Sequence, residues 1–287
     1  MKRQQIVVAG TGVLLLLVLY FFGNTVPPLK KPDAAAGGAP GAAGRKSIGL
    51  QDILSELEAH LTPAQLSYVN RLQQSVVRGD VKAQQLYADR QLAQFWKDSV
   101  TDGFLLYAYY TGEAAELENT EKSMTFAARK FLDGLQVQEN AQLKGWMATE
   151  AKGLFERALS LNSGDDSAKI GLGASYIFGA QAGDPTEVMQ GIQQILEVAR
   201  RDSTNMYAQF MLGVGGIESG QYDKAIERLT TVVRHEPGKV EALLLLAEAD
   251  QQKGDKAGAV KNFEAAKKLI GNPEMVHAID QQIKSLQ

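Results

Sequence analysis

The sequence predicts an all-α protein built as a solenoid of antiparallel helix hairpins, preceded by one N-terminal transmembrane helix. Three observations predict this fold. Beyond residue 46, apolar residues recur at helical spacing, and glycine or a Pro-containing turn interrupts them roughly every fifteen residues. Two stretches near the C-terminus resemble each other along their whole length, and an uncharged apolar run lies near the N-terminus. No stretch shows the alternation of a β-strand.

The transmembrane helix is predicted at residues 6–22. After Lys2 and Arg3 the chain carries no charge as far as Gly23, about 27 Å of helix, which is close to the thickness of a bilayer core. A cleaved secretory signal also begins with basic residues, but this apolar run is long and no small-x-small pattern follows Phe22. We therefore expect residues 1–23 to form an uncleaved signal anchor.

The segment after the anchor predicts a tether. Residues 24–46 are mostly Pro, Gly and Ala with a few basic residues, which is typical of a disordered linker. The positive-inside rule gives little orientation, because basic residues flank both ends of the apolar run. A short N-terminal head normally stays inside, so we expect a single pass in a bacterial inner membrane with the C-terminal part in the periplasm.

Composition excludes several classes of protein. The chain has 28 Gly, 8 Pro and no Cys, so it has no disulfide, no thiolate metal site and no lipid-carrying cysteine. Residues 1–46 hold six Lys or Arg and one Asp, whereas the rest of the chain is net acidic within a total charge of -3. A net acidic domain argues against nucleic-acid binding.

The repeat is clearest at the C-terminus. The stretch that starts at Tyr207 aligns with the stretch that starts at Glu241, an offset of 34 residues, and a glycine (Gly220, Gly254) falls in the turn of each. Leu212, Gly213 and Ala225 in the first unit align with Leu246, Ala247 and Ala259 in the second, and Pro237 in the first and Phe263 in the second fit further positions of one repeat consensus. This pattern and period resemble the tetratricopeptide repeat family. Small residues there let the two helices of a hairpin approach closely.

Looser units precede these two. In the same register Leu172 and Gly173 fit a first helix, and Asp184 and Pro185 fit the N-cap and first turn of its second helix. We expect repeats at about 121–165, 166–205, 206–239 and 240–273, and a polar capping helix at 274–287. Residues 47–120 predict further helices, some of them degenerate repeats, without a fixed register.

The resemblance implies a binding groove. Tetratricopeptide arrays bind peptides or protein surfaces on a face lined by their first helices, a fold-level analogy. The groove positions of the family correspond in this sequence to Ile170, Ala174, Ile177, Tyr207, Phe210, Val214, Ile217, Glu241, Leu244 and Glu248. Tyr207 and Phe210 would be anchors because aromatic residues carry much interface energy. Alternatively, the apolar members of this set are buried against neighbouring helices.

No motif indicates chemistry. His60, His235 and His277 are isolated, and the glycine-rich strings complete no nucleotide-binding loop. We therefore expect no catalytic residue, no cofactor and no metal site, and a protein that is not an enzyme. The leading hypothesis is a membrane-tethered scaffold or adaptor for protein or peptide partners in an envelope complex. The alternative is an enzyme accessory or small-ligand-binding protein with its site in residues 47–120, and a third is self-association into a homo-oligomer.

Overall fold

The structure is a computed structural model that describes residues 49–75, 80–180 and 184–286. These residues belong to the second of two units of the chain, Ser47–Gln287. Their secondary structure is entirely helical, which confirms the predicted all-α class for this part of the chain. The predicted transmembrane helix at 6–22 and the tether at 24–46 lie outside the described residues. Within those residues, no helix combines the length and apolarity needed to cross a bilayer.

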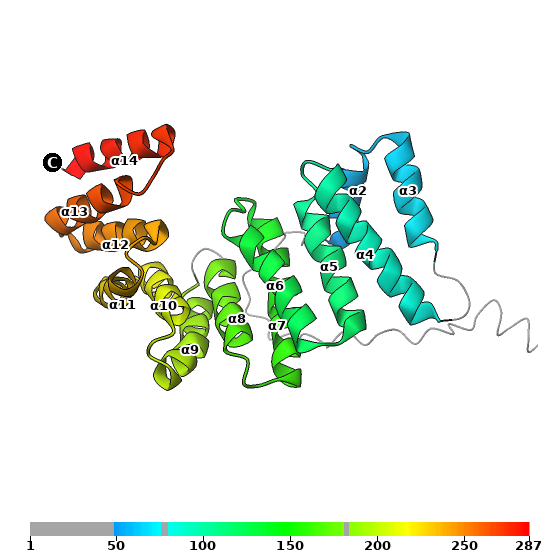
Figure 1. The fold of residues 1–287 in the computed structure, drawn as a ribbon, viewed down its shortest axis with the longest axis horizontal. Coiled ribbons are helices and arrows are strands. Elements are labelled where there is room, and N and C mark those ends of the chain that lie inside the picture. Colours follow the sequence, from blue (N-terminus) through cyan, green and yellow to red (C-terminus); the bar gives the residue numbers. More distant parts are fainter. Residues whose placement is uncertain (1–48, 76–79, 181–183, 287) are drawn as a thin grey trace, which may run out of the picture. The chain divides into compact units, whose positions relative to one another are not determined.

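Thirteen helices follow one another in the described part of the chain, and most pack on the next (Figure 1). The closest pairs are the hairpins α4–α5, α6–α7, α8–α9, α10–α11 and α12–α13. The bounds are α2 Leu50–Glu58, α3 Pro63–Gln73, α4 Val81–Ser99, α5 Phe104–Glu118, α6 Glu121–Leu135, α7 Ala141–Leu161, α8 Asp166–Gly179, α9 Pro185–Arg201, α10 Met206–Glu218, α11 Tyr222–His235, α12 Val240–Lys253, α13 Lys256–Lys267 and α14 Pro273–Leu286.

The helix ends follow local sequence signals. Asp184 caps α9 by accepting a hydrogen bond from the backbone N–H of Thr186 at 2.8 Å, and Pro185 opens the helix, as predicted. The turn glycines Gly220 and Gly254 have φ values of 70° and 89°. Glycine adopts this left-handed backbone with the least strain, which explains its presence in the turns of both C-terminal hairpins.

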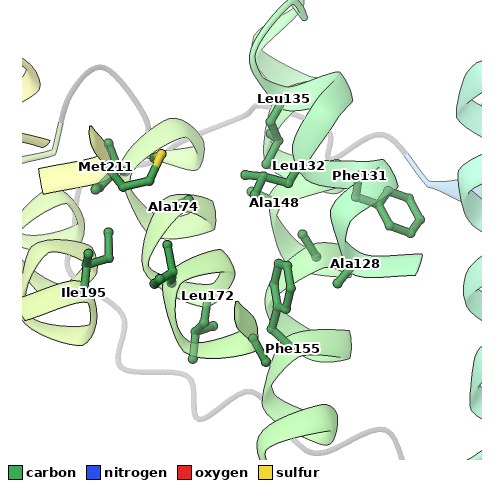
Figure 2. Packing of buried hydrophobic residues seen from close by; sticks show 14 of the residues in the cluster. Ala128, Phe131, Leu132, Leu135, Ala148, Phe155, Leu172, Ala174, Ile195 and Met211 are labelled. Atoms are coloured by element: carbon green, nitrogen blue, oxygen red, sulfur yellow. The ribbon is translucent and has the colours of Figure 1, made fainter. Parts of the chain in front are cut away.

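Small residues bring the paired helices together, as the sequence predicts. Ala225, Ala247 and Ala259 are fully buried between helices. In the α8–α9 hairpin the approach is closest where Gly173 and Gly191 face each other: a Cβ on Gly191 would lie 2.4 Å from the carbonyl oxygen of Gly173. The largest apolar cluster spans α5 to α10, and Figure 2 shows part of it around Phe155, Leu172 and Ala174.

The N-terminal helices, for which the sequence fixes no register, have a core of their own. Apolar residues of α2, α3 and α4 pack there with Leu106 and Tyr110 of α5, around the fully buried Trp96. Helix α4 packs on α5 as a hairpin, and α5 in turn packs on α6. The hairpin arrangement of the C-terminal helices therefore continues toward the N-terminus as far as α4.

Candidate partner-binding surface

The first helices of four successive hairpins form one face. Helix α8 contacts both α6 and α10, and α10 also contacts α12. Hydrogen bonds join α6 to the start of α8: the Thr125 hydroxyl donates to Asp165 at 3.1 Å, and the Arg129 guanidinium donates to the Ser167 hydroxyl. We call the solvent side of α6, α8, α10 and α12 the first-helix face. The predicted groove residues all lie on α8, α10 and α12.

Four of the predicted groove residues are core residues instead. Ile170, Ala174 and Ile177 of α8 and Val214 of α10 are buried, and all four belong to the large apolar cluster. Figure 2 shows Ala174 of α8 among buried side chains of neighbouring helices. Helix α8 packs most extensively against α9 and α7, and also against α6 and α10, so its apolar side chains are covered. These four side chains therefore do not line an open groove in this structure, in line with the alternative of burial. The partner-binding role of the groove stays a prediction.

The remaining predicted residues reach solvent to different degrees. Tyr207 is 37% exposed, and Phe210, Ile217 and Leu244 are half-buried. Burial raises the pKa of Tyr207, while Arg129 lowers it and Asp133 raises it further. Since Arg129 and Asp133 belong to α6, Tyr207 extends from α10 toward α6, across α8. The side chain of Tyr207 therefore forms part of the exposed surface beside the buried residues of α8.

Aromatic and basic side chains gather on the α6 side. Phe126 is 52% exposed, and the ammonium group of Lys130 lies 5.3 Å from the centre of its ring. Away from α6, the ammonium group of Lys239, the residue before α12, lies 4.5 Å from the centre of the ring of Phe210 on α10. The repeat pattern did not indicate Phe126, because this position is not among the groove positions that the family resemblance supplies. The available signal for its exposure was its position on α6, on the side of the helix opposite the buried apolar residues.

Carboxylates gather on the α12 side. Glu241 and Glu248 are exposed on α12, and Glu218 is exposed at the end of α10. Burial raises the pKa of Glu248, and the charge of Glu218 raises it further, so these two carboxylates face each other. Within the described residues, none of the three side chains forms an ion pair or hydrogen bond. The first-helix face thus carries unpaired negative charge at one end.

The described residues offer little for chemistry. No group of three His, Asp or Glu side chains among them could hold a metal ion. The ring Nδ1 of His235 lies 2.9 Å from the carbonyl oxygen of Thr231, and His277 hydrogen-bonds Gln281. The expected absence of catalysis and of cofactors stays a prediction. In the N-terminal region, where the alternative hypothesis places a ligand, an open cleft of about 440 Å³ lies between α3 and α4 beside Tyr68 and Phe95.

The fold and this face define a class: a helical repeat protein whose hairpins stack their first helices side by side. The model of the tetratricopeptide repeat family matches residues 217–281, from the end of α10 into α14. Tetratricopeptide repeats are therefore confirmed for this C-terminal segment. Membrane anchoring stays a prediction.

Similar proteins include the cellulose synthase operon protein C of Escherichia coli K12, which is 35% identical over 83 residues, 29% of this chain. The putative cellulose synthase operon protein C of E. coli O157:H7 matches to the same extent. The match spans only 7% of the length of these relatives.

Two solved structures are also similar at low identity. MamA 41-end from Desulfovibrio magneticus RS-1 is 18% identical with a TM-score of 0.47, over 67% of this chain and 97% of that one. YrrB, described as a TPR protein with an unusual peptide-binding site, is 13% identical with a TM-score of 0.45, over 76% of this chain and 98% of that one.

Proposed function

We propose that this protein is a membrane-tethered scaffold or adaptor that binds protein or peptide partners on its first-helix face. The observation that carries this proposal is the pair of exposed aromatic side chains there, Phe126 at 52% and Tyr207 at 37%. Aromatic anchors beside charged groups are typical of protein interfaces. The tetratricopeptide match at residues 217–281 also supports it, because this repeat family generally binds proteins.

The charges on the face suggest how the charged residues of a bound segment are arranged along it. Arg129 and Lys130 lie at the α6 end, where Lys130 also pairs with Asp133 at 3.1 Å, and the unpaired Glu218 and Glu248 lie at the α12 end. A partner segment with apolar residues in the middle, acidic residues toward α6 and basic residues toward α12 would complement both ends. Because these charges are solvent-exposed, such binding should weaken as salt is added.

Photo-crosslinking in cells tests the use of this face. A photoreactive amino acid in place of Tyr207 should capture a specific protein, whereas the same amino acid in place of Tyr87, which is 62% exposed on α4, should not. Once the partner is identified, Tyr207→Ala should weaken its binding at least fivefold, the loss of more than about 1 kcal/mol that an interface anchor causes. Tyr87→Ala is the matched control and should leave the affinity unchanged.

Two results would contradict this use of the face. If the captured protein binds Tyr207→Ala and a Glu218→Gln, Glu248→Gln double variant as tightly as the original chain, the first-helix face is not its binding site. If Tyr207→Ala lowers the melting temperature as much as a core truncation does, Tyr207 is a packing residue. Glu227→Gln, which changes an exposed residue of α11 outside this face, controls for the loss of charge alone.

The proposed location is a bacterial inner membrane, with residues 6–22 spanning it and the helical part in the periplasm. The uncharged apolar run and the Pro-, Gly- and Ala-rich segment at 24–46 support this location. A tether of this length would raise the local concentration of the binding face near membrane proteins of an envelope complex. A reporter enzyme that works only in the periplasm, fused to the C-terminus, should be active, and activity of a cytoplasmic reporter instead would refute the orientation.

A further inference from the structure

A buried carboxyl group on α4 has no evident role in partner binding. Asp89 is 7% exposed, and its Oδ2 atom is completely enclosed with no hydrogen-bond partner in the described part of the protein. Asp250 on α12 is buried to the same degree, but the Asn262 side chain donates a hydrogen bond to its Oδ2 at 2.7 Å. A buried charge without a donor or a cation is costly, so Asp89 requires a different explanation from Asp250.

Within the part of the chain that the structure describes, the charge acting on Asp89 comes from another acid, and the basic residue beside it is already paired. Its neighbour on α4, Arg90, forms an ion pair with Glu118 of α5 at 2.7 Å. The charged group that acts on Asp89 is Glu113 of α5. Burial and then Glu116 raise the pKa of Glu113, while the hydrogen bond from Tyr109 and the charge of Arg157 of α7, which pairs with Glu116, lower it. Two tyrosines of α5 connect Asp89 and Glu113 to further titratable groups. Tyr109 hydrogen-bonds Glu113 and faces Glu150 of α7. Tyr110 faces Glu58 of α2 and accepts a hydrogen bond from the amide of Gln73 of α3 at 3.2 Å.

This arrangement favours the neutral acid while the helices are packed. Burial first, and then the charge of Glu113, raise the pKa of Asp89 from 3.8 to about 7. The packed state therefore binds this proton more tightly than a solvated aspartate does. The stability that the bound proton adds to the packed state is fully present below pH 3.8. The stability falls as the pH rises above that value, and it stops falling once the pH exceeds about 7.

We propose that Asp89 makes the contact between α4 and α5 a pH-dependent latch, in which the protonated carboxyl keeps the helices packed and its ionisation opposite Glu113 promotes their local opening. The opening releases the N-terminal side of the solenoid, because the main contacts of α4 are with α5 and α3. It exposes the apolar surface around Leu92 and Trp96 of α4, which is covered by Leu106 of α5 and its neighbours in the packed state. Neutral to alkaline conditions thus raise the population of the open form.

Hydrogen exchange of the full chain tests the latch. Exchange of the α4 amides is measured at pH 5.5 and pH 8.5 and expressed as protection factors, which removes the intrinsic effect of pH on exchange. For a group that titrates near pH 7 in the packed state, protection of α4 should fall about thirtyfold between these two conditions. Asp89→Asn, which keeps the shape but cannot ionise, should lose this fall, whereas protection of α9 should be nearly constant in both proteins.

Two further variants control the test. Asp102→Asn changes an exposed carboxylate in the turn between α4 and α5 and should behave like the original chain. Glu113→Gln removes the facing charge and should move the midpoint of the α4 transition to lower pH. The latch is refuted if protection of α4 is the same at both pH values, or if Asp89→Asn retains the fall. Should Asp89→Asn not fold, an unchanged midpoint in Glu113→Gln refutes it.

Discussion

Adding one methyl group at Gly191 tests how closely α8 and α9 approach. In Gly191→Ala the new Cβ would lie 2.4 Å from the carbonyl oxygen of Gly173, and 2.9 Å from the side chain of Ile177. The oxygen belongs to the backbone of α8, so it cannot rotate away as a side chain would. Since carbon and oxygen atoms in contact lie more than 3 Å apart, the two helices must separate by several tenths of an ångström.

The magnitude follows from comparison with Gly153→Ala in α7, where no atom lies within 4 Å of the added Cβ. Both substitutions lie inside helices, so each gains about 1 kcal/mol of helix propensity, and this gain cancels in the difference. Overpacking of a dense contact costs about 1–3 kcal/mol. Gly191→Ala should therefore be about 1–3 kcal/mol less stable than Gly153→Ala, a melting-temperature difference of about 2–12 °C for a domain of this size.

Thermal unfolding of both variants, followed by circular dichroism, measures this difference. Gly153→Ala should melt at or above the temperature of the original chain, and Gly191→Ala below Gly153→Ala. If the two variants have the same melting temperature, the contact between Gly173 and Gly191 is looser than in the structure. Close helix packing then does not explain glycine at these positions.

Three other changes should each reveal a different contribution to stability, measured by urea unfolding. Phe155→Ala should cost about 3–5 kcal/mol, because the ring is fully buried in the largest apolar cluster; a loss below 1 kcal/mol would contradict that packing. Gly254→Ala should cost about 1–2 kcal/mol from backbone strain alone, since φ is 89° and no atom lies within 4 Å of the added Cβ; no loss would mean the turn relaxes freely. Thr62→Ala should cost about 1 kcal/mol, because Thr62 caps α3 by accepting from the Gln65 N–H at 3.3 Å and its own N–H donates to the Gln65 side chain at 2.9 Å; Ser67→Ala, at an exposed position inside α3, is its control.

Local features of the fold could be predicted from the sequence because they depend on neighbours in the chain. Asp184 and Pro185 begin α9 by a capping interaction within two residues. Gly220 and Gly254 end helices because a left-handed backbone favours glycine. The 34-residue offset between the last two units reflects hairpins that bury matching small residues, among them Ala225 and Ala259.

The candidate site was predicted less well, because exposure on a helix depends on other helices. Apolar spacing alone does not distinguish Ile170, which is buried on α8, from Phe210, which is half-buried on α10. Asp89 is followed by Arg90 and Gln91, and nothing in this polar stretch indicates that Asp89 is buried; the packing of α4 on α5 creates its burial. Phe126 is apolar, which favours a core position, yet it is exposed on α6.

The burial of the apolar side chains of α8 changes which groups a partner can contact on the first-helix face. Because Ile170, Ala174 and Ile177 are covered, the middle of the face contributes no apolar pocket of its own, and Tyr207 extends over it toward Arg129 and Asp133. Apolar anchoring is then concentrated at Phe126 and Tyr207. The carboxylates of Glu218 and Glu248 lie beyond them on α10 and α12. A partner segment short enough to contact only α8 would find little to bind, so the proposed interaction requires a segment that reaches from α6 to α12. Successive truncation of an identified partner segment from its basic end should therefore reduce the effect of Glu248→Gln before it reduces the effect of Tyr207→Ala.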